Sequence, residues 1–473
     1  MEAEYDFGMI GIGVMGSNLL LNMADHGYAV IGFDLKKERA DALEAAAPKG
    51  TKVKGVTNLE EMVRSLKKPR RIMMLVPAGK PVDDVIGNLL PFVEKEDIVI
   101  DGGNSYFKDT LKRILFLQDK GIHFFGMGVS GGEMGARLGP SMMPGGDKRA
   151  YQYLKPVLEA VAAKADGIPC VAYMGNNAAG HYVKMVHNGI EYAMMQMISE
   201  VYDLLHRSGG FSNEQLHLIF SQWNEGQLHS YLIEITAEIF KTKDEGSNNF
   251  LVDEILDQAG SKGTGKWTSQ EAMDLPVSIP TIDMAVAMRD LSVYKEQRVN
   301  ASKIAQSKVG KIEITETILT ELENALAFCF VIAYTQGMSM LAKASVILNM
   351  NIPLPDVITV WKAGCIIRSA LLGNFTDAYN KEPQLPNLLL DRDIATLLKN
   401  REDSIRNIIS LAVHAKIPVA GISSALAYYD AFLSSRLPVN LIQAQRDYFG
   451  AHTYQRIDKE GVFHTEWHSE RND

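Results

Sequence analysis

The stretch FGMIGIGVMGSNLLLNMADHG occupies residues 7–27. Its apolar start predicts a β-strand over Phe7–Ile12, and Ser17–His26 follows as a helix that ends at Gly27, a residue type common just after a helix. The loop between them is a GxGxxG made of Gly11, Ile12, Gly13, Val14, Met15 and Gly16. Glycines in this context let the backbone and a helix N-terminus approach a pyrophosphate. The stretch therefore predicts a dinucleotide-binding βαβ unit.

An acidic residue follows the second predicted strand, Ala29–Phe33. Asp34, followed by Leu35 and Lys36, stands where a carboxylate accepts hydrogen bonds from ribose hydroxyls and repels a 2′-phosphate. The sequence therefore favours NAD over NADP as the cofactor. Lys36 and Lys37 leave NADP open, because two cations can also hold a 2′-phosphate, although they can equally begin a solvated helix.

The pattern of the remaining chain predicts three parts. Further strands expected at Arg71–Val76, Ile98–Asp101 and His123–Val129 alternate with helices, which is typical of a parallel sheet. From Gly180 onward the apolar spacing is helical over His181–Leu205, Ser212–Phe240 and Ile314–Leu348, with loops expected at Asp244–Asn249 and Ala259–Ser269. We expect an α/β Rossmann-type domain over residues 1–179, a large all-α domain over 180–436, and a short extended C-terminal tail over 437–473.

Composition excludes several classes of protein. The 473 residues are 46% hydrophobic, with 48 Lys+Arg against 57 Asp+Glu and a net charge of −9. This predicts a folded protein without a general nucleic-acid or anionic-membrane surface. The three cysteines, Cys170, Cys329 and Cys365, form no CxxC pair, and we expect neither disulfides nor a metal site. The N-terminus is acidic and no apolar run reaches about 18 residues, so a cytoplasmic location is expected.

The segment GHYVKMVHNGIEY, residues 180–192, gathers polar side chains on one helical face. With Lys184 at zero, His187 projects near −60°, Asn188 near +40°, Glu191 near −20° and Tyr192 near +80° at about 100° per residue. The surrounding helix is apolar, so an unpaired charge on it would be costly. One reading is a structural Lys184–Glu191 ion pair. The other is an acid–base pair, in which a desolvated lysine takes up a proton and a carboxyl with a raised pKa delivers one.

Glycine-rich turns supply further candidates. Asp101–Ser105 and Val129–Glu133 each follow a predicted strand, so both should face the crevice at the carboxyl ends of the sheet, unless they are ordinary turns. Lys262–Lys266 has the composition of a phosphate-binding loop but not the P-loop spacing. Arg289 lies in an apolar helical run, where a cation requires an anionic partner.

Six motifs together resemble the 6-phosphogluconate dehydrogenase family, the decarboxylating enzymes of the pentose phosphate pathway. The resemblance covers essentially the whole chain, and its most specific parts lie at Gly11–Gly27, Asp101–Thr110, Gly128–Gly146, Gly180–Tyr192, Lys262–Thr268 and Leu441–Tyr454. It implies oxidation of 6-phospho-D-gluconate at C3, loss of C1 as carbon dioxide, and release of ribulose 5-phosphate.

The resemblance also implies roles for single residues. Lys184 is the expected general base and Glu191 the expected general acid. The substrate is expected to contact Asn104, Ser130, Gly131, Gly132, His187 and Asn188, with its phosphate held by Tyr192, Lys262 and Arg289. Arg446 and His452 are expected to complete the site from the tail of a partner subunit, because the family is typically homodimeric. The dinucleotide is expected to contact the GxGxxG, Asp34, Leu35, Lys36, Val76, Pro77, Ala78 and Asn104, and no metal is implied.

The chain departs from the family pattern at the cofactor. NADP-dependent members carry Asn-Arg-Thr or a close variant where this chain has Asp34-Leu35-Lys36, and Pro77 stands where many have lysine. Two other functions remain open from the sequence. One is another β-hydroxyacid dehydrogenase, of the 3-hydroxyisobutyrate type. The other is a dinucleotide-binding sensor without chemistry.

Overall fold

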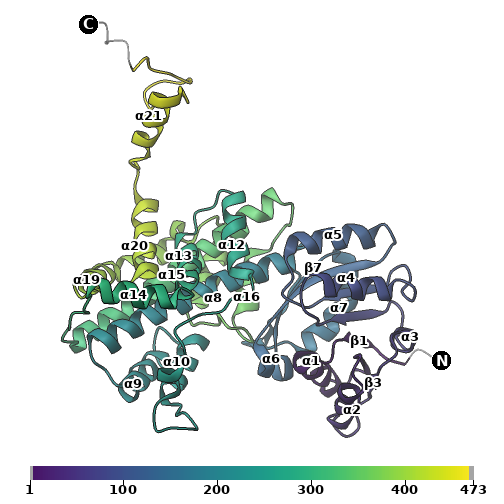
Figure 1. Cartoon of the computed structure of the whole chain (residues 1–473). Helices are drawn as coiled ribbons and strands as arrows, with labels where there is room; N and C mark the ends of the chain where they lie inside the picture. The colour runs from purple at the N-terminus through teal and green to yellow at the C-terminus, as the bar shows by residue number, and fades with distance from the viewer. Residues whose placement is uncertain (1–3, 468–473) are drawn as a thin grey trace. The chain divides into compact units, whose positions relative to one another are not determined.

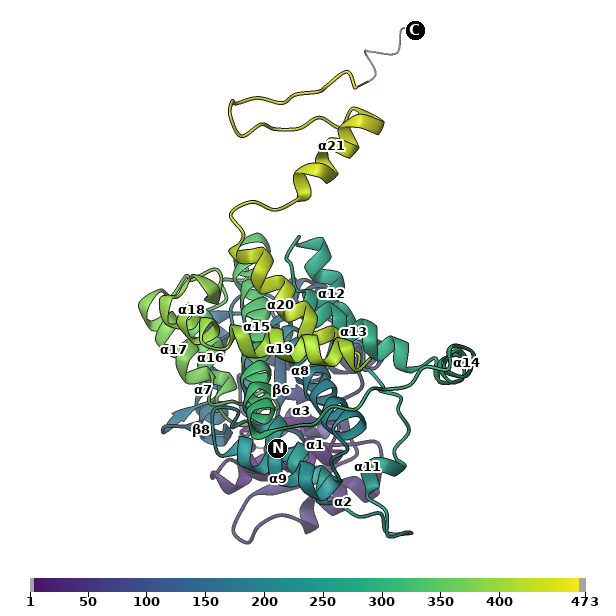
Figure 2. The ribbon, with the colours of Figure 1, turned by 90° about the vertical axis from the view of Figure 1, so that its left-hand side faces the viewer.

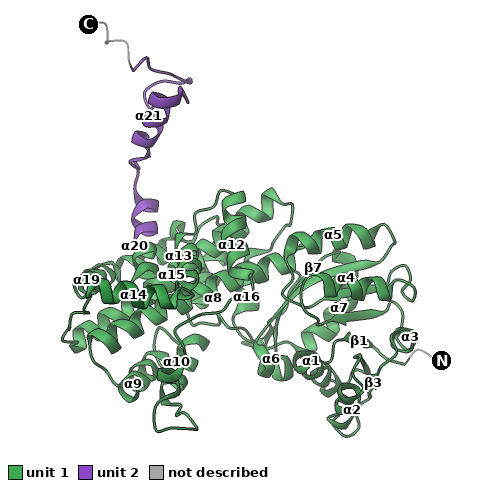
Figure 3. Ribbon diagram, viewed as in Figure 1, with its two compact units in different colours: residues 1–425 green, residues 426–473 purple. Residues whose placement is uncertain are grey.

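The computed structural model describes residues 4–467, which divide into two compact units. One unit ends at Ala425 and the other begins at Leu426 (Figure 3). The division falls within helix α20, Ala420–Leu433. Each unit is described by itself below.

The N-terminal part of the first unit is a seven-stranded sheet in the order β3-β2-β1-β4-β5-β6-β7. Six strands are parallel, and β7 runs antiparallel to β6 at the edge. The strands are β1 (Phe7–Ile10), β2 (Val30–Phe33), β3 (Val53–Val56), β4 (Arg71–Met74), β5 (Ile98–Asp101), β6 (His123–Ser130) and β7 (Ser141–Gly145). The order reverses direction between β1 and β4, and dinucleotides bind at such a switch point in open α/β sheets. The predicted Rossmann-type fold is confirmed.

Helices cover both faces of this sheet (Figure 1). One buried core joins the sheet to α1 (Val14–Asp25), α2 (Lys37–Ala45), α6 (Gly132–Leu138) and α7 (Lys148–Val161). The other joins it to α3 (Leu59–Arg64), α4 (Lys80–Leu89) and α5 (Phe107–Gln118). Successive side chains of a strand point to opposite faces of the sheet, and because both faces are covered the strands are almost wholly apolar. In β1, Met9 belongs to the first core and its neighbour Ile10 to the second.

The rest of the first unit is helical, as the sequence predicts. Two short strands, β8 (Lys164–Ala165) and β9 (Ile168–Pro169), precede it. Its helices are α8 (Ala179–Asp203), a π-helical turn (Leu204–Ser208), α9 (Asn213–Asn224), α10 (Tyr231–Lys241), α11 (Leu251–Glu254), α12 (Thr264–Asp274), α13 (Pro280–Ser292), α14 (Lys295–Ala305), α15 (Glu316–Ile347), α16 (Leu354–Trp361), α17 (Leu372–Lys381), a 3-10 turn (Leu388–Leu390), α18 (Arg392–Lys399) and α19 (Glu402–His414).

Helices α8 and α15 lie at the centre of this helical part (Figure 2). Helix α8 packs on α12, α13 and α15 and on strands β6 and β7, so it joins the helical part to the sheet. Within the described residues, α15 is the one helix long and apolar enough to cross a membrane by composition, yet 89% of its most apolar window is buried inside the fold. Its contacts with α8 and α19 are those of a core helix.

The structure differs from two predicted elements of this unit and adds two strands to the predicted sheet. The segment expected as a single helical stretch over Ser212–Phe240 is broken between α9 and α10, where the chain turns at Gly226. The loop expected over Ala259–Ser269 is wrong in its second half, because α12 begins at Thr264. Strands β3 and β7 are absent from the predicted set. Strand β7 contains Pro144 and Gly145, which weaken the strand pattern in a sequence.

The second unit contains the end of α20 and α21 (Val439–Gly450). The expectation of an extended tail is therefore wrong over α21; the apolar Leu441, Ile442 and Phe449 are all exposed in this unit and mark no buried stripe. Asp447, near the end of α21, organises the chain that follows this helix. Its enclosed carboxylate accepts hydrogen bonds from the backbone of Thr453 and Thr465 and from the rings of His464 and Trp467.

Candidate active site

The glycines of the GxGxxG have three different environments. Gly11 has φ +85°, and a Cβ there would lie 2.6 Å from the Leu75 carbonyl oxygen. A Cβ on Gly16 would lie 2.1 Å from the Gly11 carbonyl oxygen, so this glycine permits the close packing of α1 on the loop. No atom lies within 4 Å of a Cβ built on Gly13, the residue that precedes α1. The helix N-terminus is therefore open to a ligand.

A cavity of roughly 810 Å³ begins at this loop. It lies at the carboxyl ends of β1, β2 and β4, and among the residues that line it are Gly11, Gly13, Asp34, Leu35, Val76 and Pro77. The predicted cofactor residues Val14, Leu35, Lys36, Pro77 and Ala78 are exposed, whereas Ile12 is buried in the core and Met15 is half-buried. The open backbone N–H groups and the size of the cavity fit a dinucleotide.

Asp34 has a partner that the sequence did not reveal. Arg39, on the first turn of α2, donates from Nη1 to Asp34 Oδ2 at 3.0 Å. The backbone N–H of Lys36 donates to the other carboxylate oxygen at 3.0 Å. Arg39 also lines the cavity, so its guanidinium lies beside the carboxylate that the sequence assigns to the ribose hydroxyls.

Helix α8 approaches the sheet through glycines. A Cβ on Gly180 would lie 2.1 Å from the Gly126 carbonyl oxygen, and one on Gly145 would lie 2.2 Å from the Gly180 nitrogen. A Cβ on Gly128 would lie 2.4 Å from Lys184 Cβ. These close approaches place Lys184 directly over β6, at the end of the strand that leads to Ser130.

The polar face of α8 forms a connected chain of side chains. Lys184 Nζ lies 3.4 Å from His187 Nδ1, which in turn donates to Asn188 Oδ1 at 3.1 Å. The amide of Asn188 donates to Thr264 Oγ1 at 3.1 Å, and Ser130 Oγ lies 3.4 Å from His187 Nε2. Because the His187 Nδ1–H points at this region, an ammonium on Lys184 would face another donor. The arrangement favours the neutral amine.

Lys184 and Glu191 do not pair directly in the part of the chain that the structure describes. His187 lies between them, with Nδ1 3.8 Å from a Glu191 carboxylate oxygen. Lys184 is 6% exposed and His187 fully buried, whereas the Glu191 side chain remains 21% exposed. The structural ion pair that the sequence left open is therefore not formed.

Burial shifts both groups toward their neutral forms. Desolvation lowers the pKa of Lys184 below its ordinary value, against the opposing attraction of Glu191. Desolvation likewise raises the pKa of Glu191, although Lys184 and Arg289 act in the other direction. His187 has its pKa well below the usual value, because of burial and the nearby lysine. An amine able to accept a proton and a carboxyl able to donate one therefore lie on one helical face.

The two glycine-rich turns lie at the carboxyl ends of neighbouring strands, β5 and β6. Buried Asp101 organises the first turn by accepting hydrogen bonds from the Gly103 N–H at 3.0 Å and from Ser105 Oγ at 2.6 Å, which leaves Asn104 exposed. In the second turn, Gly131 has φ +115° and Gly132 has φ +63°, and no atom lies within 4 Å of a Cβ on Gly132. Both turns offer polar groups beside α8.

A second polar group surrounds Tyr192, one residue beyond Glu191. The Arg289 guanidinium lies 3.6 Å from the centre of the Tyr192 ring, and its Nη1 donates to the Gly260 carbonyl at 3.3 Å. Gly260 belongs to the loop that carries exposed Lys262. The structure thus brings this loop to Arg289 and Tyr192.

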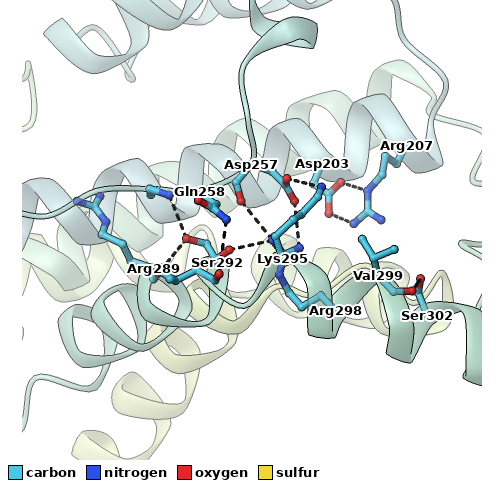
Figure 4. A network of polar contacts seen from close by, with 12 residues as sticks. Asp203, Arg207, Asp257, Gln258, Arg289, Ser292, Lys295, Arg298, Val299 and Ser302 are labelled. Carbon is cyan, nitrogen blue, oxygen red and sulfur yellow. Dashed lines mark hydrogen bonds and ion pairs between the residues drawn. The ribbon is translucent and has the colours of Figure 1, made fainter.

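The same loop is fastened to α13 and α14 (Figure 4). Asp257 binds Lys295 and, at 3.0 Å, Arg298. The Ala259 N–H donates to Ser292 Oγ at 3.0 Å. These contacts fix the chain three to five residues before Lys262, which restricts where the lysine can reach.

Two predicted substrate residues belong to the second unit. Arg446 lies on α21 and His452 just after it, and both are exposed. They flank Asp447 and Thr453, the residues around which the tail is folded.

Sequence reasoning missed three residues of this region. Arg39 lies five positions after Asp34 and returns to it only because α2 begins at once after β2. Thr264 contacts Asn188 only because α12 packs on α8, and Gly128 matters only because Lys184 crosses β6. Gly128 and Thr264 lie within quoted motifs, but nothing local in the sequence shows which distant residue each of them contacts.

The cysteines and potential metal ligands add no further site. Cys170, Cys329 and Cys365 are buried and free. Over residues 4–467, no three His, Cys, Asp or Glu side chains are grouped as a metal would need.

Comparisons with known proteins identify the family to which the fold belongs. The family model for the NAD binding domain of 6-phosphogluconate dehydrogenase matches residues 6–189, and the model for the C-terminal domain of that enzyme matches residues 180–467. The chain is 50% identical over 99% of its length to "6-phosphogluconate dehydrogenase, decarboxylating" of Lactococcus lactis, of which it covers 100%. It is 49% identical over 98% of its length to the NADP(+)-dependent, decarboxylating enzyme of Bacillus subtilis, of which it covers 99%.

A solved structure is also similar over nearly the whole chain. The 6-phosphogluconate dehydrogenase of Plasmodium falciparum, studied alone, with its cofactor NADP+ and with its substrate 6-phosphogluconate, superposes with a TM-score of 0.94 at 43% identity. The match covers 98% of this chain and 100% of that one. The resemblance drawn from the six motifs is confirmed, and it is favoured over another β-hydroxyacid dehydrogenase and over a sensor. This chain belongs to the 6-phosphogluconate dehydrogenase family, whose members are NAD(P)-binding, decarboxylating oxidoreductases.

Proposed function

We propose that the chain converts 6-phospho-D-gluconate to ribulose 5-phosphate and carbon dioxide, with Lys184 as general base and Glu191 as general acid. The observation that carries these roles is the face of α8, where burial favours an unprotonated lysine and a protonated carboxyl within two helical turns. A bound nicotinamide supplies the hydride acceptor. The residues that would hold the dinucleotide are those of the GxGxxG and of the cavity beside it.

The protein's own groups then carry proton transfers in both directions. Neutral Lys184 takes the proton of the substrate 3-hydroxyl as hydride leaves C3. The resulting ammonium returns that proton to the C3 ketone oxygen as the C1–C2 bond breaks and carbon dioxide leaves. The electrons of that bond form a C2–C3 double bond and the π electrons of the ketone move onto its oxygen, which gives an enediol. Glu191 then delivers a proton to the former C2, which becomes C1 of ribulose 5-phosphate, and the C3 hydroxyl gives its proton back to Lys184 as the ketone forms again. Decarboxylation of a β-keto acid requires only an electron sink at the ketone, so no metal is needed.

The substrate's two ends are assigned to different groups. We assign the sugar-acid end to Asn104, Ser130, Gly131, Gly132, His187 and Asn188. The phosphate end is assigned to Tyr192, Lys262 and Arg289. Support comes from the Arg289–Tyr192 contact and from the fastened loop that precedes Lys262.

We further propose a homodimer in which Arg446 and His452 of a partner subunit complete each site. The tail supports this through its exposed apolar residues, among them Leu441, Ile442 and Phe449, which an isolated chain leaves in water. The three-part division at residues 179 and 436 and a cytoplasmic location belong to the same proposal. For the cofactor, Asp34 beside the cavity favours NAD.

Steady-state kinetics with 6-phosphogluconate tests the activity and the cofactor choice together. Carbon dioxide release should accompany dinucleotide reduction in equal amounts, and kcat/KM should be higher with NAD. A higher value with NADP would overturn the NAD preference, and reduction without carbon dioxide would overturn the reaction.

Mixed dimers test the shared site. In a dimer of one Lys184→Met chain and one Arg446→Ala chain, a tail that crosses to its partner leaves one site with both groups intact, so activity should return toward half that of the wild type. If each tail serves its own chain, both sites stay defective and no activity returns.

A further inference from the structure

Three cationic residues follow β2 closely in the sequence: Lys36, Lys37 and Arg39. Their side chains lie in different places. Lys37 binds Asp41 at 2.6 Å on the exposed surface of α2. The Lys36 side chain is exposed, and neither lysine lines the dinucleotide cavity. Arg39 does line it, together with Asp34, Gly11 and Gly13. The cation placed to meet the ribose end of a dinucleotide is therefore the arginine.

The contacts of Asp34 leave room for a ligand. Its carboxylate has about four lone-pair positions, and two are used, one by Arg39 and one by the Lys36 N–H. The side chain is 9% exposed, so these two donors fix its orientation. Two positions remain for hydroxyl donors, as adjacent ribose hydroxyls require.

The contacts of Arg39 also leave capacity. A guanidinium has five N–H donors, and the structure gives it one acceptor, Asp34 Oδ2. The side chain is 48% exposed at the rim of the cavity. Its planar fork matches phosphate oxygens in pairs, which the ammonium of a lysine does not.

We propose that Arg39 is a second determinant of dinucleotide preference. It favours NAD when it is paired with Asp34 and favours NADP when it is not. Bound to Asp34, it holds the carboxylate in place for ribose hydroxyls, and its own charge is neutralised. Released from Asp34, it binds a 2′-phosphate. The inference deepens the proposed cofactor choice and rests on it for the direction of the wild-type preference.

Four proteins test this: the wild type, Asp34→Ser, Arg39→Ala and the double variant. Dissociation constants for NAD and NADP are measured by titration without the sugar acid, so that the result does not depend on Lys184 or Glu191. Steady-state kcat/KM with each dinucleotide is measured beside them. Arg64→Ala is the matched control, because Arg64 pairs with Glu60 on the surface of α3 in the same domain and does not line the cavity.

In the wild-type background, Arg39→Ala should weaken NAD binding by about threefold. The Asp34 carboxylate then loses its hydrogen bond from Arg39 and keeps the one from the Lys36 N–H. Asp34→Ser should shift the NADP to NAD ratio of kcat/KM at least about tenfold toward NADP. Adding Arg39→Ala to Asp34→Ser should then weaken NADP binding by at least about tenfold, which is the effect of losing a charge-assisted hydrogen bond. The same change should weaken NAD binding by less than about threefold. The control should change neither.

The proposal is overturned if Arg39→Ala, in the Asp34→Ser background, leaves NADP binding within about threefold or weakens NAD and NADP alike. A wild type that prefers NADP would overturn only the proposed NAD preference, because the comparison within the Asp34→Ser background would still measure what Arg39 does.

Discussion

Lys184 crosses strand β6 directly over Gly128. A Cβ on Gly128 would lie 2.4 Å from Lys184 Cβ and 2.9 Å from its Cγ. Real Cβ atoms do not approach other carbons so closely, so the strand can carry only glycine while the lysine keeps its place. A residue with no functional group thus fixes the position of the proposed base.

Replacing this glycine should displace the lysine. Gly128→Ala is expected to lower kcat by about a hundredfold, because a shift of about 1 Å in a reacting group has effects of this size. Overpacking should also lower the free energy of unfolding by about 1–3 kcal/mol. Gly373→Ala on α17 is the control, since nothing lies within 4 Å of a Cβ there. Equal, small effects of both variants on kcat would contradict this account.

The phosphate end should depend on the shape of Arg289 as well as its charge. Arg289→Lys keeps the cation but loses the planar group that lies on Tyr192 and reaches Gly260. KM for 6-phosphogluconate should rise at least about tenfold, while kcat and KM for the dinucleotide change little. A lysine variant with an unchanged KM would remove Arg289 from the phosphate site.

The pH dependence of kcat should report Glu191 and Lys184. Burial raises the pKa of Glu191, so its donating form persists above the ordinary range and is lost as pH rises through the raised value. Burial lowers the pKa of Lys184, so its accepting form is lost as pH falls through the lowered value. A bell-shaped profile results. Glu191→Gln should lower kcat by about a hundredfold or more and flatten the alkaline limb; an alkaline limb that persists in this variant would assign it to another group.

Stability should follow the same shift of Glu191. A pKa raised in the folded state means that folded protein binds more protons than unfolded protein between the two pKa values. The free energy of unfolding should therefore fall as pH rises from about 4.5 through the raised value, and this slope should be weaker in Glu191→Gln. Urea titrations across this range measure it.

The tail should lose its shape when Asp447 loses its charge. Four donors meet this carboxylate, and they hold its pKa at about 2. Asp447→Asn cannot accept all of them, so proteolysis should cleave the segment after α21 faster. If Arg446 and His452 complete the site, KM for the sugar acid should rise with little change in kcat. Faster proteolysis with an unchanged KM would separate the tail from substrate binding.

Local patterns in the sequence predicted the sheet and the polar face of α8 because both depend on neighbours in the chain. The GxGxxG fixes a turn between a strand and a helix, and a period of 3.6 residues brings Lys184, His187 and Asn188 together. Helix α12 was missed because Gly263 and Gly265 are typical of loops. Contacts of Thr264 and Thr268 with α8 stabilise the helix there, and these lie far apart in sequence.

The cofactor site shows the same limit. Asp34 could be recognised by its place after a strand, but its neutralisation by Arg39 depends on the path of the turn into α2. Arg446 and His452 could be predicted as substrate residues only through resemblance, because no periodicity or spacing in the sequence points to either of them. Long-range packing, rather than propensity, decides these positions.

Turnover by Lys184→Met tests the central claim most directly. Methionine keeps the length and packing of the buried side chain but cannot take up a proton, and Lys184→Arg serves as a charged comparison. The account predicts that kcat falls by at least about a thousandfold, while the dissociation constant for the dinucleotide stays within about threefold of the wild type. Turnover within tenfold of the wild type, with bound dinucleotide, would contradict the assignment of Lys184 as the base.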